Sequence, residues 1–374
     1  MSADTHPSEP SAATPRLSLV IDNHNAAAHV GRAIESALAQ IGVDPIEALE
    51  IIVVDDGSTD DSLAVIGRYA ERGVRLIARP EGGQGAAYNA GFAAARGERV
   101  LFLDADDWLY PDAVAEVLAA WEPGISKVQF LLDLVDAGGR PLGRQVPREL
   151  HDVEAPQLLR EYGAYGSPPG SGNVYDRAFL AQVLPMDEAT WRLDADSIPV
   201  LLAPLHGRVL SLPLALGAYR VRGPERESLV LHHGNGSLRA EYRRIRDGKA
   251  AVVATLDRLG VPHATPIGLA PWEARTLVLC ARFGGAETRA ETRAEMTPSM
   301  LAVLWQALRS VWQWPLLLPR RRLLMLGWMV AVALLPGWPA RWLAAQHRRH
   351  AGAVDPNLSA RTAATRLNVL ASRP

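Results

Sequence analysis

The stretch VLFLDADD at residues 100–107 is the strongest signal in this sequence for both fold and chemistry. Its apolar residues predict a buried strand, and three carboxylates follow within one turn. Asp104 and Asp106 stand two positions apart, so in an extended segment both side chains can face the same side. Crowded carboxylates repel one another unless a cation neutralises them, and oxygen ligands favour Mg²⁺ or Mn²⁺. The alternative is a solvated acidic turn in which Asp106 or Asp107 caps the following helix.

A second apolar strand also ends in acids. Residues 51–60 read IIVVDDGSTD, so Asp55 and Asp56 follow four apolar, β-branched residues and precede Gly57. A carboxylate at a strand end can accept hydrogen bonds from a nucleotide base or from ribose hydroxyls. The same pattern also fits a plain strand-to-helix turn.

These two strands belong to a regular alternation that predicts an α/β fold with a parallel sheet and helices on its faces. Ligands of such sheets bind beyond the carboxyl ends of the strands, where the acids of this sequence fall. Ser58 or Thr59 is the expected N-cap of the second helix. Strands are expected at 17–21, 50–54, 74–78 and 99–103, and helices at 26–40, 58–72 and 85–96.

The second half of the chain is less regular. Strands are expected at 127–134 and 208–212, a loop rich in Gly, Pro and Ser at 166–172, and helices over 237–283. Residues 287–295 repeat Glu-Thr-Arg-Ala and are expected to be a polar connector.

Composition excludes several classes of protein. The 374 residues are 48% hydrophobic and 21% charged with a net charge of -2, so the chain as a whole has no excess of positive charge that would attract nucleic acid, and no nucleic acid is expected as a partner.

The single Cys280 cannot form an internal disulfide, which favours a reducing compartment, and a buried, inert thiol is favoured over a nucleophile. Residues 1–15 are rich in Ser, Pro, Ala and Thr, so we expect a disordered leader rather than a secretory signal.

Taken in order, the motifs resemble glycosyltransferase family 2. SLVI at 18–21, Asn25 and AIESALAQ at 33–40 resemble the opening of that family. The run at 55–60 resembles its second motif, GQGAAYNAG at 83–91 its third, and residues 97–112 its Asp-X-Asp region. The resemblance is dense over 17–118 and patchier to about 225.

The resemblance implies a GT-A fold, a Rossmann-like and mostly parallel mixed sheet flanked by helices, within residues 16–230. It implies a nucleotide-sugar half at 16–120 and an acceptor half at 121–230. A helical extension at 231–300 and a Trp- and Arg-rich segment at 301–374 complete the expected organisation.

The resemblance also implies site residues. Asp104 and Asp106 would bind the metal. The family usually has Pro-Thr-Tyr-Asn after the first strand, whereas residues 22–25 here read DNHN, which leaves the nucleotide open. The residues implied to contact the nucleotide sugar are Asn25, Asp55, Asp56, Gly85, Asn89, Asp104 and Arg220. Arg220 belongs to YRVR at 219–222, and the alternative is that these arginines pair with surface acids.

Transfer of a sugar to a hydroxyl needs a carboxylate that takes the proton. The stretch WRLDAD at 191–196 matches the family's base motif, although the usual Glu is absent. Spacing to Gly207 favours Asp196 as the catalytic base, and Asp194 is kept as the alternative; either could instead cap the following helix. GSGN at 170–173 resembles the small-residue loop below the acceptor, and His232 and His233 are interpreted as a solvent-facing pair.

The segment 323–340 carries no charged side chain and is flanked by arginines at 320–322 and at Arg341. Pro336 and Pro339 limit a continuous helix, so a spanning helix is marginal. Trp and Arg together favour a helix lying in the headgroup zone, with a core helix, a partner helix or a true span as alternatives. We therefore expect a cytoplasmic protein held at the inner face of the cell membrane. Five tryptophans punctuate the region, at positions 312, 314, 328, 338 and 342.

The sequence as a whole predicts an inverting, metal-dependent glycosyltransferase of hexosyl type. It would move a sugar from a nucleotide-diphosphate sugar to a glycan or lipid-linked acceptor in the synthesis of a cell-surface polysaccharide or glycoconjugate. The alternative is a non-catalytic nucleotide-sugar-binding or scaffold protein of a glycan assembly complex. A nucleotidyltransferase is disfavoured because the loop after the first strand lacks the expected Gly and basic residues.

Overall fold

A computed structural model describes residues 14–42, 49–221, 238–284 and 299–350. Most of the expected leader, the connector at 287–295, and His232 and His233 lie outside the described residues.

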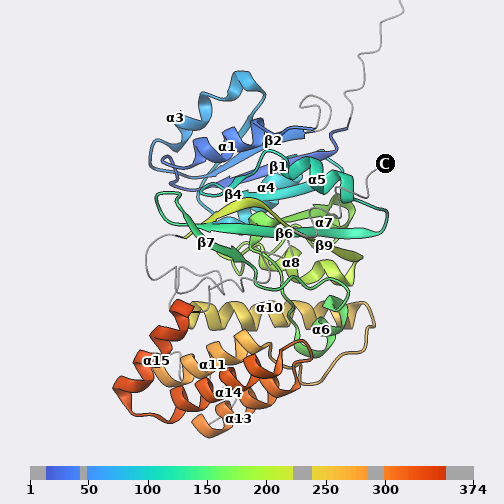
Figure 1. Ribbon diagram of the computed structural model, residues 1–374. Helices are drawn as coiled ribbons and strands as arrows, with labels where there is room; N and C mark the ends of the chain where they lie inside the picture. Colours follow the sequence, from blue (N-terminus) through green and yellow to red (C-terminus); the bar gives the residue numbers. More distant parts are fainter. Residues whose placement is uncertain (1–13, 43–48, 222–237, 285–298, 351–374) are drawn as a thin grey trace, which may run out of the picture.

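One nine-stranded sheet runs through the upper part of the molecule in the order β3-β2-β1-β4-β8-β6-β9-β5, with β7 paired to β6 (Figure 1). β3, β2, β1 and β4 are parallel, whereas β8 is antiparallel to both β4 and β6. The first half is therefore the predicted parallel sheet, and β8 joins it to a mixed second half. The strands are β1 (Leu17–Asn23), β2 (Leu49–Asp56), β3 (Arg75–Arg79), β4 (Arg99–Asp104), β5 (Trp108–Leu109), β6 (Ile125–Val135), β7 (Pro141–Val146), β8 (Asn173–Asp176) and β9 (Arg208–Arg220).

Helices cover both faces of the sheet. Those of the first 220 residues are α1 (Val30–Leu38), α3 (Ser62–Gly67), α4 (Gln84–Ala94), α5 (Ala113–Ala120), α6 (Ala155–Tyr162), α7 (Arg177–Val183) and α8 (Ser197–Leu202), with short 3₁₀ turns at Ala70–Arg72, Gly170–Gly172 and Ala203–Leu205.

The expected start of the second helix is wrong. α3 begins at Ser62 with Asp61 at its N-cap position, not Ser58 or Thr59. The Ser58 hydroxyl instead accepts hydrogen bonds from the Asn25 N–H at 2.9 Å and from Asn23 Nδ2 at 3.2 Å. The loop after β1 therefore occupies the group that was expected to cap the helix.

Alternating side chains of the strands enter two separate cores. Leu19 and Ile21 of β1 pack in the core that contains α1 and α5, whereas Val20 faces α4 on the opposite side. The α4 helix lies very close to the sheet, because a Cβ added at Gly91 would come within 2.3 Å of Val20 Cγ1. A glycine at this position lets α4 lie against β1 and β2.

The C-terminal helices build a third core below the sheet in the view of Figure 1. Trp314 lies at the junction, buried against Tyr162, whose hydroxyl donates to the Gln313 carbonyl at 2.9 Å. Cys280 is buried in this core, as expected, and burial raises the pKa of its thiol to about 12. These helices are α10 (Leu238–Arg258), α11 (Pro271–Phe283), α13 (Met300–Gln313), α14 (Pro319–Leu334) and α15 (Gly337–His350).

The apolar segment near the C-terminus is divided between two helices. α14 ends at Leu334 and α15 begins at Gly337, so the helix breaks at Pro336 as predicted. Within the described part of the chain, no helix combines the length and the apolar character that a membrane crossing would require.

Candidate active site

Strand register places two acids side by side at the carboxyl end of the sheet. β1 and β4 are parallel neighbours, and Asp22 is paired with Asp104. Burial raises the pKa of Asp22 to about 7. Burial, followed by repulsion from Asp22, raises the pKa of Asp104 well above its usual range. Asp22 therefore joins the acid cluster that the sequence placed at 104–107.

The turn that follows β4 is held from two sides. Asp107 accepts a hydrogen bond from the Ser171 hydroxyl at 2.6 Å and another from the Arg220 N–H at 2.8 Å. The Arg220 guanidinium donates from Nε to the Asp106 carbonyl at 3.0 Å and from Nη1 to the Ala137 carbonyl at 2.7 Å. In this structure Arg220 fixes the Asp-X-Asp turn, and its contact with a diphosphate stays a prediction.

The acid cluster has the chemistry that a hard divalent cation needs. Asp22 Oδ1 is buried and has no hydrogen-bond partner among the described residues. A cation would relieve the repulsion between the partly buried carboxylates of Asp22 and Asp104. No three His, Cys, Asp or Glu side chains of the described residues converge into a complete metal site. Mg²⁺ commonly takes only one or two carboxylates and completes its shell with phosphate oxygens and water, so Asp104 and Asp106 suit that role.

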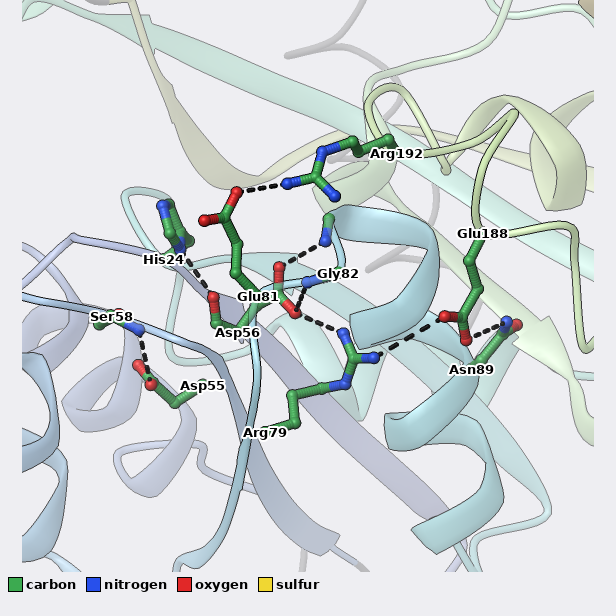
Figure 2. Close-up of polar contacts among 11 residues, drawn as sticks. His24, Asp55, Asp56, Ser58, Arg79, Glu81, Gly82, Asn89, Glu188 and Arg192 are labelled. Atoms are coloured by element: carbon green, nitrogen blue, oxygen red, sulfur yellow. Dashed lines mark hydrogen bonds and ion pairs between the residues drawn. The ribbon is translucent and has the colours of Figure 1, made fainter.

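Asp55 and Asp56, the last two residues of β2, accept hydrogen bonds from other residues of the protein, as Figure 2 shows. Asp55 accepts from Asn23 Nδ2 at 2.7 Å and from the Ser58 N–H at 3.0 Å. Asp56 accepts from Arg79 and from the N–H groups of Gly82 and Gly83, the latter two at 3.0 and 2.6 Å. These bonds hold the strand end and the loop before α4.

Asn25 has a similar role in the loop after β1. Its side-chain oxygen accepts from the N–H groups of Thr59 at 2.8 Å and Asp60 at 3.3 Å. The backbone of Asn25 is left-handed, with φ of 49°, a conformation that Asn tolerates better than most residues. Contacts of Asn25, Asp55 and Asp56 with a nucleotide stay predictions beside these observed roles.

Two more predicted residues, Gly85 and Asn89, connect α4 to the second half of the chain. Asn89 accepts from the Met186 N–H and donates to the Met186 carbonyl, both at 2.9 Å, and it also donates to Glu188 (Figure 2). The Gly85 N–H donates to the Trp191 carbonyl at 2.9 Å, and a Cβ added at Gly85 would lie 2.6 Å from that oxygen. Both positions therefore hold the 186–196 segment against the nucleotide-sugar half.

Gln84, which the sequence analysis did not single out, bridges the acid cluster and the base segment. Its Nε2 donates to Asp22 at 3.3 Å and lies 3.5 Å from Asp104 Oδ1. Its Oε1 accepts from the Ala195 N–H at 3.0 Å. The position of Gln84 near the start of the third motif was the available signal, but Asp22, Asp104 and Ala195 lie 20 or more residues away in the sequence.

The two candidate bases occupy different positions. Asp196 is buried, accepts a hydrogen bond from the Gly170 N–H at 3.0 Å, and lines a cavity of about 410 Å³. Its charge also contributes to the raised pKa values of Asp22 and Asp104. Asp196 stands at the N-cap position of α8, yet its side chain makes no capping hydrogen bond, contrary to the alternative of a simple cap.

Asp194 lies beside that cavity's lining rather than in it. Its backbone is left-handed, with φ of 56°. Burial raises the pKa of its carboxyl to about 6, against the lowering effect of Arg244. Asp196 both lines the cavity and acts by its charge on Asp22 and Asp104, which favours it as the base over Asp194.

A buried lysine supports the small-residue loop below Asp196. Lys127 is fully buried, and its ammonium group donates to Gln129, Ser167 and Asn173 at 2.9, 2.8 and 3.0 Å. Burial lowers its pKa well below the usual range. From the sequence, Lys127 is only a member of an expected strand, because a lysine in a strand does not by itself indicate burial.

Comparison with known proteins is consistent with this geometry. The glycosyl transferase family 2 model matches residues 18–178. The succinoglycan biosynthesis protein ExoO of Rhizobium meliloti is 32% identical over 243 residues, which cover 62% of this chain and 68% of the relative. An uncharacterized glycosyltransferase of Nostoc is 36% identical over 215 residues, 56% of this chain and 65% of that relative. The chain belongs to glycosyl transferase family 2.

A solved structure supports the fold. S. aureus TarS residues 1–349, crystallised with UDP-GlcNAc, superposes with a TM-score of 0.51 over 90% of both chains at 18% identity. The predicted GT-A fold with C-terminal helices is confirmed.

The contacts of Asp56 predict a structural effect. Asp56→Asn should lower the free energy of unfolding by about 2–4 kcal/mol, because a charged acceptor for three donors is lost. Urea denaturation without nucleotide measures this. The exposed Asp61→Asn is the matched control and should change stability by less than about 0.5 kcal/mol. Unchanged stability together with weaker nucleotide binding would instead return Asp56 to a role in ligand binding.

The raised pKa of Asp194 predicts a pH effect. The pKa of the Asp194 carboxyl is 3.8 in the unfolded chain and about 6 in the folded one, so the folded state holds its proton to higher pH. The free energy of unfolding therefore falls as pH rises from 4 to 6. Asp194→Asn should remove that loss, which is at most about 3 kcal/mol. The measurement is the difference in unfolding free energy between variant and wild type across this range. A difference that does not vary with pH would show that Asp194 ionises normally.

Proposed function

We propose that this protein is an inverting glycosyltransferase that uses a nucleotide-diphosphate sugar and a divalent cation. The observation that carries the proposal is the position of Asp196, which lines the cavity on one side and acts on Asp22 and Asp104 on the other. A carboxylate in this position can act as the base between a donor bound at the acid cluster and an acceptor bound in the cavity.

On the donor side, Asp104 and Asp106 would hold Mg²⁺ or Mn²⁺ against the diphosphate. The cation would neutralise the charge that develops on the leaving nucleoside diphosphate. Gln84 positions Asp22 and the Ala195 backbone relative to one another, so donor and base segments keep a fixed separation. The Ser171 and Arg220 bonds keep the Asp-X-Asp turn in place during binding.

On the acceptor side, Asp196 would take the proton of the attacking hydroxyl. The acceptor oxygen forms a bond to the anomeric carbon as the bond from that carbon to the phosphate oxygen breaks. The electron pair leaves with the nucleoside diphosphate, and the proton ends on Asp196. A single displacement of this kind inverts the anomeric centre, and its transition state resembles an oxocarbenium ion.

The proposed acceptor is a glycan or lipid-linked molecule of surface polysaccharide synthesis. Support comes from relatives, among them the succinoglycan biosynthesis protein ExoO and a chondroitin synthase of Pasteurella multocida that is 40% identical over 102 residues. That alignment covers 27% of this chain and 10% of the synthase.

We further propose that the C-terminal helices rest on an anionic membrane surface. α13 to α15 carry large apolar side chains that face solvent, among them Trp305 at 69% and Trp338 at 77% exposure. Tryptophan prefers the interface, and arginines such as Arg320 add attraction to anionic lipid. These helices lie at the opposite end of the molecule from α1 and α3 (Figure 1).

The donor role predicts the behaviour of Asp106→Ala. Its hydrolysis of nucleotide sugars, scanned over several donors with Mn²⁺, should fall at least about 100-fold while circular dichroism stays native. The exposed Asp112→Ala, just beyond the same turn, is the control and should retain wild-type rates. Full activity of Asp106→Ala would refute the metal role, and donor binding without turnover by the wild type under any condition would favour the scaffold alternative.

The membrane role predicts binding to vesicles. The protein should float with phosphatidylglycerol vesicles and much less with phosphatidylcholine, and a double variant with Trp305→Ser and Trp338→Ser should lose most of that binding. Val153→Ser, which removes an exposed apolar side chain from the catalytic domain, should bind as the wild type does. Equal binding by the double variant would place the contact elsewhere.

A further inference from the structure

The cavity beside Asp196 lies between the catalytic domain and the C-terminal helices. Its walls come from the 145–151 segment, the 163–169 loop, the start of α8, and helices α10, α11 and α14. Asp196 is the only group of the proposed catalytic machinery among the described residues that line it. A molecule in this cavity would therefore meet the catalytic site through Asp196.

The cavity has an excess of positive charge. The described lining contains five basic side chains and three carboxylates. Two of the carboxylates are neutralised, because Glu149 pairs with Arg321 at 2.7 Å and Glu273 with Lys249 at 2.8 Å. The third is Asp196. The lining also contains Arg148, Arg244 and Arg275, which come from three separate segments of the chain.

Arg244 is the member of this set whose surroundings call for a ligand. Its Nε and Nη2 atoms are buried, and neither has a hydrogen-bond partner among the described residues. Buried donors almost always have partners, and leaving one unpaired is destabilising, more so when the group is charged. An anion in the cavity would supply the missing acceptors. Arg244 also lowers the pKa of Asp194, which places its charge near the base segment.

The rest of the lining is aromatic and aliphatic. Trp272 and Trp314 meet edge to face, with ring centroids 5.2 Å apart, and both line the cavity. Leu324 of α14 lines it too and is 65% exposed, so the cavity reaches the apolar surface of the C-terminal helices. An occupant can therefore have both a charged group and an apolar or glycosyl portion.

We propose that this cavity binds a phosphate group of the acceptor, held by Arg244 together with Arg148 and Arg275. Phosphate fits better than carboxylate because it offers three terminal oxygens and up to two charges to arginines that line the cavity from different segments. The inference rests on the proposed function for the identity of the acceptor, but not for the anion site. The phosphate could belong to an isoprenyl phosphate or to a glycosyl phosphate.

The experiment measures binding of small probes without donor or metal. Glucose 1-phosphate is compared with glucose, and farnesyl phosphate with farnesol in detergent, by calorimetry on the full chain. The variants are Arg244→Gln, Arg244→Lys and Arg148→Gln. Arg258→Gln is the matched control, since Arg258 lies on the same helix and is exposed outside the cavity.

At least one phosphate probe should bind at least tenfold more tightly than its neutral counterpart. Arg244→Gln and Arg148→Gln should weaken that binding about tenfold, Arg244→Lys less, and Arg258→Gln by no more than twofold. Stronger binding of farnesyl phosphate would identify a lipid source, and stronger binding of glucose 1-phosphate a glycosyl source. If Arg244→Gln does not fold, Arg148→Gln carries the same test.

Any of three results would overturn the inference. The first is equal binding of phosphate and neutral probes, and the second is equal binding by the wild type and both arginine-to-glutamine variants. The third is that glucuronate binds as tightly as glucose 1-phosphate, which would remove the assignment to phosphate. Because these assays contain no nucleotide sugar, they can fail while Asp106→Ala still loses donor hydrolysis, and the reverse also holds.

Discussion

The pairing of Asp22 with Asp104 across parallel strands is the constraint on which the site depends. Register places two partly buried carboxylates side by side where β1 and β4 end, and desolvation raises the pKa of both. Two like charges at such close range are relieved when a proton or a cation is shared between them. The register of the sheet thus creates a cluster of negative charge that a metal-bound diphosphate would neutralise.

The second half of the chain is held to this cluster through α4. Gln84, Gly85 and Asn89 each hydrogen-bond the 186–196 segment, and that segment brings Asp196 to the cluster. The third sequence motif therefore acts here as the connection between donor and acceptor halves. Rigid placement matters, because a misplacement of about 1 Å at reacting groups can cost about 100-fold in rate.

The sequence predicted the parts whose signal is local. The strands ending at Asp56 and Asp104, the parallel half-sheet and the helix break at Pro336 follow from periodicity and from proline. It placed Asp22 at the carboxyl ends of the strands but did not reveal its pairing with Asp104, nor the roles of Gln84 and Lys127, because these depend on partners 46 to 111 residues away. It also placed a helix cap at Ser58, a position whose hydroxyl the loop after β1 uses instead.

Anomalous diffraction from crystals soaked with Mn²⁺ and a nucleoside diphosphate tests the central claim most directly. We expect one strong manganese peak next to Asp104, Asp106 and the diphosphate oxygens, with Asp196 facing the same pocket from the acceptor side. A diphosphate bound elsewhere, or a manganese peak distant from both acids, would contradict it.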